Sequence, residues 1–515
     1  MKIKSVGIKR FRSYENPIRV EFEDLCVLVG PNDVGKSTVL EALDIFFNDG
    51  KGSVKLDKDD VNKTCLARDE TDIEIHVEFS ELPEKIVIDS THETNLKNEY
   101  LLTSRGTLQI IKRYPNSGKE RVFIKALHPA NPNCQDLLLK KNPELKKLLE
   151  EQELNCTDKT KNAELRKAIW AGQSDLQMQD LEIEVAKIDS KDIWERLKSY
   201  MPLYTLFQSD RKNTDSDDEV QDPMRIAVKE ILGDQAIQEK LTSVAETVKN
   251  RLNQVATNTL DKLKELNPAI ASSLNPQLPD AGSLKWGDVF KSVTIKVDDD
   301  ISINKKGSGV KRLVLFSFFR AEAERRRRDA NLPSVVYAIE EPETSQHPQH
   351  HRDLTDALIE LSKNANTQVL MTTHSPEIVK RLEFKNLLLV SDNKSGTGLN
   401  KISNVVEHEL PYPSLNEVNF VAFNEATSEY HNELYGFIDA KCWMPDYSSG
   451  RPNRSYVELK NGEAKQPKNI DSTKYIRHQI HHPENHHNPR YEHDELVESI
   501  QAMREFINTK KLSVS

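Results

Sequence analysis

Hydrophobic and polar residues alternate over much of residues 1–130, which predicts a β-rich opening. The alternation runs from Lys2 to Arg10 and from Ile18 to Glu23, on either side of a turn at Asn16-Pro17, and therefore predicts a β-hairpin. A second hairpin is indicated around Asn116-Ser-Gly118, where a turn separates two alternating runs. The strands expected in this region are 2–10, 18–23, 72–79, 108–114 and 121–125.

Helical spacing replaces alternation from about residue 133. Segments rich in Lys, Glu and Leu predict an inserted helical arm, with one strand returning at 201–207 and a long amphipathic helix at 220–266. Such charged helices are more often solvent-exposed levers or dimer surfaces than specific binding sites. Further on, the expected strands are 334–341, 368–373 and 386–390, and the expected helices are 313–327, 348–363, 415–438, 472–481 and 492–508.

A phosphate-binding loop lies between the apolar run 25–29 and a helix expected at 36–47. Gly30-Pro-Asn-Asp-Val-Gly-Lys-Ser37 fits the pattern G-x-x-x-x-G-K-[ST] at every fixed position. Glycines let the backbone N–H groups of such a loop point at the β- and γ-phosphates, while Lys36 supplies a positive charge and the Ser37 hydroxyl ligates Mg²⁺. ATP and Mg²⁺ are therefore the expected cofactors. The loop residues expected to bind them are Asn32, Gly35, Lys36, Ser37 and Thr38.

Two strand ends in the second half supply groups that nucleotide hydrolysis needs. The strand at 334–341 ends in two carboxylates, of which Glu340 is expected to hold Mg²⁺ and Glu341 to polarise the attacking water. His374 follows the buried strand at 368–373, at the end where ligands bind in open α/β sheets. This placement makes His374 a candidate sensor of the γ-phosphate.

A Gly-Ser-Gly turn forms a possible anion site. Ser308 and Gly309 belong to this turn, which precedes the helix expected at 313–327. The exposed N–H groups at the start of a helix attract anions. Taken alone, such a turn is weak evidence for a binding site.

Composition excludes several classes of protein. The chain has 515 residues, enough for two to four domains. Its mean hydropathy is −0.64, no apolar run approaches roughly 18 residues, and the start lacks the apolar core of a signal peptide, so we expect a cytoplasmic protein without a membrane partner. Five scattered cysteines without a C-x-x-C pair fit a reducing compartment. The net charge of −10 argues against general nucleic-acid binding but leaves room for a local basic groove.

The order of these motifs resembles that in the ABC-type ATPase heads of the RecF, SMC and OLD-like families. The phosphate loop is followed by Gly-Ser-Gly-Val, by Ile-Glu-Glu-Pro-Glu343 and by Thr-Thr-His374-Ser-Pro. Phe11-Arg12-Ser13 resembles the element that these families place beside the nucleotide, so Arg12 joins the expected binding residues. The resemblance covers about residues 1–400. It implies that Ser308 contacts the γ-phosphate held by an opposite subunit, in a homodimer or a higher homo-oligomer formed through the heads.

Two residues depart from the family pattern. Glu340 stands where Asp is usual, and Glu at this position is common in the OLD-like branch. Gln346 stands where Leu is expected before His347-Pro348. Neither change argues strongly against hydrolysis. The Q-loop of the family has one candidate, Gln208, which follows the strand at 201–207.

The last part of the chain resembles a different family. Arg477-His478-Gln-Ile-His-His482 matches the R-[N/D/H]-x-x-x-H motif of HEPN ribonucleases, and the match implies metal-free RNA cleavage by Arg477, His478 and His482. Arg477 and His482 would be about 140° apart on a helix, so a turn at Pro483 or a second subunit has to bring them together. An ABC head joined to a HEPN module resembles the PrrC and RloC anticodon nucleases.

Two other interpretations of this tail stay open. Six histidines fall between His478 and His493, so a metal site is conceivable, yet neighbours such as His481 and His482 cannot both face one side of a helix. The tail would otherwise be an oligomerisation module, or a docking platform for a separate effector.

The sequence therefore predicts an α/β ABC-type ATPase head with an inserted helical arm and a C-terminal all-α module. The expected parts are 1–130, 131–270, 271–405 and 410–515. The leading function is an ATP-driven switch of a bacterial anti-phage defence system that controls cleavage of RNA, such as tRNA, by its own HEPN-like module. One alternative is a sensor or scaffold ATPase that holds an effector nuclease encoded nearby, as in Septu-like and PARIS-like systems. The other is an SMC- or RecF-like ATPase acting in DNA repair.

Overall fold

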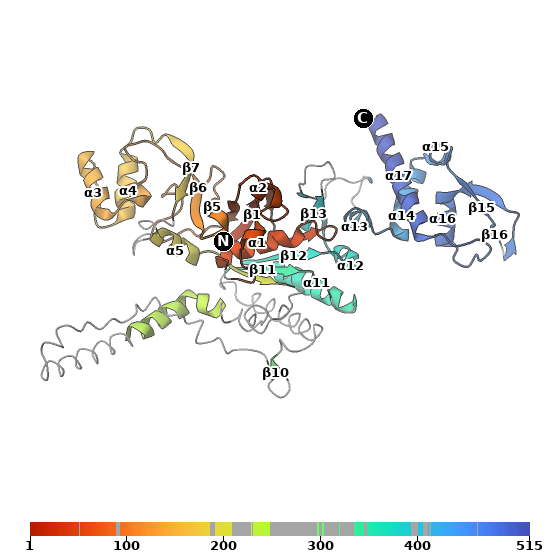
Figure 1. Ribbon diagram of the computed structural model, residues 1–515, viewed down its shortest axis with the longest axis horizontal. Helices are drawn as coiled ribbons and strands as arrows, with labels where there is room; N and C mark the ends of the chain where they lie inside the picture. Colours follow the sequence, from red (N-terminus) through yellow and green to blue (C-terminus); the bar gives the residue numbers. More distant parts are fainter. Residues whose placement is uncertain are drawn as a thin grey trace.

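The computed structural model places a central head, built around two sheets, between two smaller units (Figure 1). Helices α3 (Asn142–Glu151) and α4 (Asn162–Ala171) form one end, and the C-terminal module forms the other. The structure describes residues 1–50, 52–88, 93–185, 191–208, 228, 230–247, 296–297, 301–302, 319, 334–344, 348–392, 400–404, 410, 414–460 and 462–514.

An antiparallel six-stranded sheet opens the head and confirms the expected β-rich start. Its order is β2-β1-β4-β5-β6-β7. Val6 pairs with Val20 across the first hairpin. The large apolar residues of β1 and β4 are buried as predicted, with the alternation of β1 shifted at an irregularity between Ile3 and Ser5. The strands are β1 (Lys2–Lys9), β2 (Ile18–Glu21), β4 (Ile73–Ser80), β5 (Leu108–Tyr114), β6 (Arg121–Pro129) and β7 (Met178–Glu184).

Strand β7 corrects the helical expectation for residues 133–200. It pairs antiparallel with β6 along its whole length, although most of its residues lie at least partly in solvent. An edge strand obtains its hydrogen bonds from a single neighbour and tolerates polar residues on both faces, so its sequence carries little β signal. The helices that the structure describes in this segment, as expected there, are α3, α4 and α5 (Lys191–Ser199).

A second six-stranded sheet carries the phosphate loop. Its order is β14-β13-β3-β12-β11-β8, and all neighbours are parallel except the edge strand β14. Strand β12 therefore lies between β3, which precedes the loop, and β11, which ends in Glu340. The strands are β3 (Leu25–Val29), β8 (Leu203–Phe207), β11 (Val335–Glu340), β12 (Thr367–Thr373), β13 (Leu387–Asp392) and β14 (Asn400–Asn404).

Helix α1 (Lys36–Asn48) packs between the two sheets. One hydrophobic core contains Leu40 of this helix, Val77 of the first sheet and Leu370 of the second. The opposite face of the second sheet packs against α11 (Pro348–Ser362) and α12 (Pro376–Val379) in a separate core. The second sheet is thus covered on both faces, as parallel sheets require.

The remaining elements of the head are short. They are α2 (Lys63–Ala67), the 3₁₀ turns Lys58–Asp60, Pro115–Ser117, Leu137–Leu139 and Phe384–Asn386, and the strands β9 (Lys296–Val297) and β10 (Ile301–Ser302). Residues 230–233 and 235–247 are helical, and they lie in the stretch expected as a long amphipathic helix. The other residues of that stretch, and the helix expected at 313–327 except for helical Phe319, lie outside the described residues.

The C-terminal module has a hydrophobic core of its own but is not all helical. Its helices are α13 (Leu415–Phe423), α14 (Ser428–Ala440), α15 (Met444–Ser448), α16 (Ser472–His481) and α17 (His493–Val514). The expected helix 415–438 is interrupted because Asn424 takes a left-handed conformation, and Thr427 then caps α14.

Two small antiparallel sheets between α15 and α16 correct the all-α expectation. The first pairs β15 (Asn453–Tyr456) with β18 (Lys468–Asp471), and the second pairs β16 (Leu459–Lys460) with β17 (Glu463–Ala464). Gly462, with φ of 81°, lies in the turn between β16 and β17. These strands are too short to show a clear alternation in the sequence.

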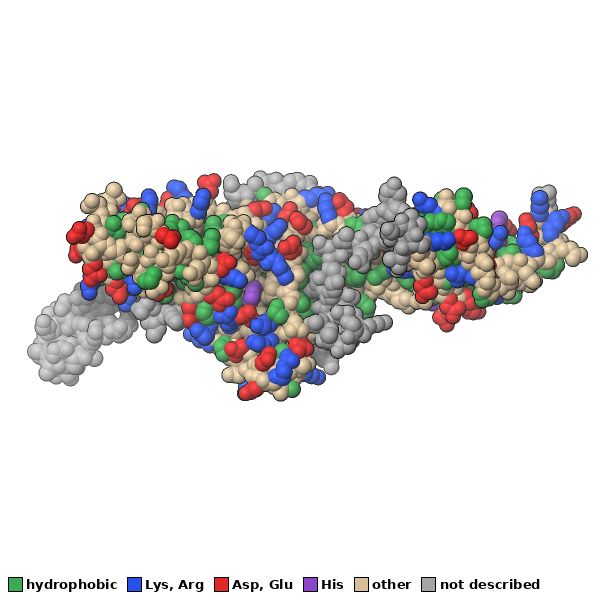
Figure 2. Space-filling view, turned by 90° about the horizontal axis from the view of Figure 1, so that it is seen from above, with side chains coloured by type: hydrophobic (Ala, Val, Ile, Leu, Met, Phe, Trp, Pro, Cys, Tyr) green, Lys and Arg blue, Asp and Glu red, His purple; other side chains and the backbone are tan. Residues whose placement is uncertain are grey.

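Two surface properties follow from the described residues. None of their helices combines the length and the apolar character that crossing a membrane requires. Basic and acidic side chains are interspersed over the face shown in Figure 2.

A buried ion pair anchors the α3–α4 unit to the head. Arg166 of α4 donates from Nε and Nη2 to the carboxylate of Glu99, at 2.7 and 3.0 Å, and both side chains are almost fully buried. We expect Arg166→Met to lower the local free energy of unfolding of α3 and α4 by about 3 to 5 kcal/mol, because it leaves a buried carboxylate without its partner. Amide hydrogen exchange of these helices measures this change.

The pair of Arg121 with Glu184 is the matched control. It joins the same two chemical groups, but the Arg121 side chain is 54% exposed. Arg121→Met is expected to change the local free energy of unfolding, measured by amide hydrogen exchange, by less than about 1 kcal/mol. Equal effects of the two substitutions would contradict the anchoring role of Arg166.

Candidate active site

The loop between β3 and α1 has the backbone that phosphate binding requires. Gly30 has φ of 152°, and a Cβ placed there would lie 2.2 Å from the carbonyl oxygen of Val390. Gly35, with φ of 96°, occupies the N-cap position of α1, where no side chain accepts a hydrogen bond from the first turn. The N–H groups at the start of α1 therefore remain available to an anion.

Lys36 is the first residue of α1, and its side chain reaches back into this loop. Its ammonium group donates to the carbonyl oxygens of Gly30 at 2.9 Å and Pro31 at 2.7 Å, and the residue is only 5% exposed. Burial lowers the pKa of Lys36, while the carboxylates of Glu341, Glu343 and Asp33 act in the opposite direction. Carbonyl oxygens of the loop therefore accept hydrogen bonds from Lys36, and carboxylates of the loop and of the segment after β11 favour its charged form.

The ends of β11 and β12 place two carboxylates around one imidazole. Nδ1 of His374 lies 3.4 Å from a carboxylate oxygen of Glu341 and 3.4 Å from one of Glu343. Glu341 has φ of 39°, and its N–H donates to the carbonyl oxygen of Thr372 at 3.0 Å. Parallel strands end at the same edge of a sheet, so β11 and β12 bring these groups together beside the phosphate loop.

Glu343 is a site residue that belongs to the Ile-Glu-Glu-Pro-Glu motif but for which the sequence predicted no role. Its side chain is 4% exposed, and it accepts hydrogen bonds from the Thr373 hydroxyl at 2.7 Å and from the N–H of His374 at 2.9 Å. These bonds fix the backbone that carries His374. Its position two residues after Glu341 is a signal that could have identified it.

A second charge cluster surrounds Arg12. Its guanidinium contacts the carboxylate of Glu41 on α1 and donates from Nε to Asp60 at 2.8 Å. Glu41 also accepts a hydrogen bond from the Gln208 side chain at 3.1 Å. Glu41 therefore links the expected binding residue Arg12 to Gln208, the candidate for the Q-loop.

The backbone around Arg12 is held as firmly as its side chain. Arg12 has φ of 48°, its N–H donates to the carbonyl oxygen of Asp60 at 2.7 Å, and its carbonyl oxygen accepts from Asn62 at 2.6 Å. The Tyr14 hydroxyl donates to the carbonyl oxygen of Gly35 at 3.0 Å. This contact connects the Arg12 turn to the phosphate loop. Glu41, Asp60 and Tyr14 could not be recognised from sequence, because their roles depend on contacts between distant segments.

The arrangement suits a triphosphate nucleotide with a divalent cation. Ser37 follows Lys36 at the start of α1, and Glu340 is the last residue of β11. A hydroxyl and a carboxylate are oxygen donors of the kind that Mg²⁺ prefers, and Mg²⁺ usually takes only one or two protein ligands beside phosphates and water. Thr38 is buried in the first turn of α1, whereas Asn32 is exposed at the tip of the loop.

Two expected site residues cannot be placed. Ser308 and Gly309, the residues expected to meet the nucleotide of another subunit, lie outside the described residues.

The expected ribonuclease residues contact different neighbours. The Arg477 guanidinium lies 4.0 Å from the ring centroid of Tyr435 on α14. His478 stacks on Tyr456 at 4.9 Å and lies 6.2 Å from His482.

His482 is the C-cap residue that follows α16, and it is exposed. Its side chain is 52% exposed, and its Nδ1 lies 3.2 Å from the carboxylate of Glu484. Among the described residues, the chain thus brings the ring of His478 near that of His482, whereas the guanidinium of Arg477 packs on Tyr435. The described part of the chain also holds no group of three or more His, Cys, Asp or Glu side chains arranged to bind a metal ion.

Glu343 positions His374, and this role can be tested. Glu343→Gln keeps the side-chain volume and an accepting oxygen but removes the negative charge beside the imidazole. We expect ATP turnover to fall by about 10-fold to 10²-fold, because the His374 imidazole is misplaced. ATP affinity should change little, because the phosphate loop stays intact. Steady-state turnover and calorimetric ATP binding measure the two quantities.

Glu383→Gln serves as the control for Glu343→Gln. Glu383 is an exposed glutamate that pairs with Lys385 at the surface. Its substitution is expected to leave turnover unchanged. Wild-type turnover in Glu343→Gln would refute the positioning role.

Three solved structures resemble this chain only loosely. The SMC head domain from Thermotoga maritima is 13% identical with a TM-score of 0.31, and the alignment covers 79% of this chain and 100% of that one. An Smc head with an extended coiled coil, bound to the C-terminal domain of ScpA and derived from Pyrococcus furiosus, is 12% identical with a TM-score of 0.36, covering 78% and 95%. An SmcHead bound to the C-winged helix domain of ScpA is 14% identical with a TM-score of 0.36, covering 78% and 98%.

A family model gives the stronger assignment. A comparison with curated proteins found no match. The model described as an AAA ATPase domain matches residues 1–379, which include the first sheet, the second sheet without β13 and β14, and the motifs of the site. With the phosphate loop, the paired carboxylates and His374 in place, this match shows that the chain belongs to the AAA ATPase domain family and is an ATPase.

Proposed function

We propose that the chain is an ATP-operated switch in which hydrolysis is carried out by Glu341 and His374. The main support for this proposal is the placement of His374 between Glu341 and Glu343. The same two carboxylates favour the charged form of Lys36 and so oppose the lowering of its pKa by burial. Lys36 neutralises the phosphates, Glu341 orients the attacking water, and His374 contacts the γ-phosphate. Ser37 and Glu340 would hold Mg²⁺, which would supply positive charge beside the phosphates.

The proposed switch closes two copies of the chain around ATP. Ser308 of one copy would contact the γ-phosphate bound to the other, as the resemblance to ABC-type heads implies. The Arg12 cluster supports a switch because Glu41 links Arg12 to Gln208, two groups expected beside the nucleotide. A bound nucleotide that takes either contact away from Glu41 changes the position of the other group.

The C-terminal module is proposed as the output of the switch. The setting we infer, from the resemblance to defence ATPases, is control of a nuclease in a bacterial anti-phage system. Arg477 packs on Tyr435, whereas His482 is an exposed residue near Glu484. This arrangement favours a module that docks a separately encoded effector over one that cuts RNA within a single chain.

The switch predicts opposite effects of two substitutions. Lys36→Ala is expected to abolish ATP binding, because it removes the positive charge at the phosphates. Glu341→Gln is expected to preserve binding and to lower turnover by roughly 10²-fold or more, because it removes only the group that orients water. Calorimetry, phosphate release and mass by light scattering measure binding, turnover and pairing.

The same measurements test the proposed pairing. Glu341→Gln with ATP and Mg²⁺ is expected to have the mass of a dimer, and adding Ser308→Arg should return it to the mass seen without nucleotide. Near-normal turnover in Glu341→Gln would refute the role of Glu341. A mass that ATP does not change in any variant would refute the pairing model while leaving hydrolysis intact.

The docking proposal for the tail makes a further prediction. Purified protein is expected to cut no RNA in the absence of nucleotide, with ATP or with ADP, because Arg477 and His482 contact different neighbours. Arg477→Ala and His482→Ala should both retain ATP turnover, since the module has its own core. RNA cleavage that persists in EDTA and disappears in both variants would establish the ribonuclease instead, because acid–base chemistry on a 2′-OH needs no metal.

A further inference from the structure

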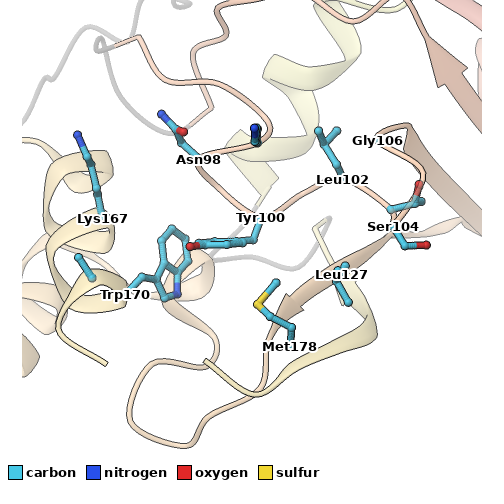
Figure 3. A pocket seen from close by; sticks show the side chains of 12 residues that line it. Asn98, Tyr100, Leu102, Ser104, Gly106, Leu127, Lys167, Trp170 and Met178 are labelled. Atoms are coloured by element: carbon cyan, nitrogen blue, oxygen red, sulfur yellow. The ribbon is translucent and has the colours of Figure 1, made fainter. Parts of the chain in front are cut away.

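A cavity separate from the phosphate loop lies where the α3–α4 unit meets the first sheet. It has a volume of about 700 Å³ and is lined by the loop at 97–106, by Leu127 of β6, by α4 and by Met178 of β7. Cavities of this size hold small organic ligands. Figure 3 shows Tyr100 and Trp170 side by side in this cavity, with Met178 and Leu127 near them.

The aromatic wall of the cavity has a fixed orientation. The rings of Tyr100 and Trp170 meet edge to face, with centroids 5.0 Å apart. The Trp170 indole donates to the carbonyl oxygen of Cys134 at 3.2 Å, and the Tyr100 carbonyl oxygen lies 2.9 Å from Nδ1 of His128. Glu99, which directly precedes Tyr100, and Arg166, which lies one helical turn before Trp170 on α4, form the buried ion pair described above. A ligand would therefore meet a wall that is already ordered, which lowers the entropy cost of binding.

The charged groups at this cavity are both positive. Lys97 lines it from the loop at 97–106 and Lys167 lines it from α4, and both residues are exposed. Within the described part of the chain, neither lysine forms an ion pair, although the chain as a whole carries a net charge of −10. Two uncompensated ammonium groups beside an aromatic and aliphatic wall suit a ligand that is anionic at one end and flat and apolar at the other.

We propose that this cavity binds a small aromatic anion, with its ring against Tyr100 and Trp170 and its charge at Lys97 and Lys167. The anionic group is a phosphate or a carboxylate, and the ligand has about the size of a mononucleotide. The site shares no residue with the nucleotide site around Lys36. It would therefore respond to a second molecule, independently of ATP.

Isothermal titration calorimetry with two probes tests this site. The full chain carrying Lys36→Ala is titrated with AMP, an aromatic phosphate, and with indole-3-acetate, an aromatic carboxylate. We expect saturable one-site binding of at least one probe, and the probe that binds identifies the anionic group. Adenosine or 3-methylindole, which lack the anion, should bind the same protein at least about tenfold more weakly.

Two variants in the same background connect the binding to the cavity. Lys97→Glu with Lys167→Glu reverses the charge and should weaken binding by more than about tenfold. Ala171→Phe adds a ring from an exposed lining position at the end of α4, and should also abolish binding without changing any charge. Lys119→Glu with Lys159→Glu makes the same change in net charge at exposed lysines that do not line the cavity, and should have no effect.

Two results would overturn the proposal. One is the absence of saturable binding for both probes at millimolar concentration. The other is binding that stays unchanged in both cavity variants, which would place the probe elsewhere on the chain. Neither result bears on ATP hydrolysis, because the proposed site and the Lys36 site are separate.

Discussion

The packing of helix α1 between two sheets is the constraint on which the rest of the head depends. The Tyr204 hydroxyl of the second sheet donates to the carbonyl oxygen of Leu40 at 2.6 Å. Lys112 of the first sheet is 1% exposed and donates to the carbonyl oxygen of Phe46 at 2.6 Å. A positive charge near the C-terminal end of a helix is favourable, and here it also joins α1 to the first sheet. With the helix held from both sides, its N-terminus has a fixed direction, and that direction defines where phosphates bind.

Hydrogen bonding to neutral groups then explains how charged side chains can be buried in a densely packed site. Lys36 donates to carbonyl oxygens of its own loop, and Glu343 accepts two hydrogen bonds from the end of β12. Unpaired charges at such positions would cost several kcal/mol each. These hydrogen bonds position Lys36 in the phosphate loop and His374 at the end of β12. The site therefore keeps its geometry through contacts that a bound phosphate would replace or reinforce.

The C-terminal module has a core of its own that contains a neutral polar chain, and Val418 and Ala422 of α13 also pack in the core of the second sheet. His431 lies 3.0 Å from the Ser499 hydroxyl, which donates to Thr473 at 2.8 Å, and the Thr473 and Tyr447 hydroxyls are 2.8 Å apart. Burial lowers the pKa of His431 to about 4, so this imidazole is neutral near pH 7. A connected, uncharged network of this kind helps to specify one packing of the helices, although Nδ1 of His431 is buried without a hydrogen-bond partner.

The sequence by itself determined the parts of the chain whose signals are local. The spacing of glycines and Lys36, the alternation in β1 and β4, and the apolar run ending in Glu340 each depend on a few neighbouring residues, and all lie in the elements that were expected. Helix and strand periods are local properties, so they can be read without knowing what lies opposite.

Only the tertiary structure decided which distant residues meet. The polar edge strand β7 and the hairpins at 453–471 form because neighbouring strands offer hydrogen bonds, and their sequences carry little periodic signal. The pairing of Glu41 with Arg12 joins residues far apart in the chain, as does the insertion of β12 between β3 and β11. Arg477 and His482 illustrate the converse, because a motif that is continuous in sequence places its two ends against different neighbours. Contacts of this kind depend on how whole elements pack, and no short stretch of sequence encodes that packing.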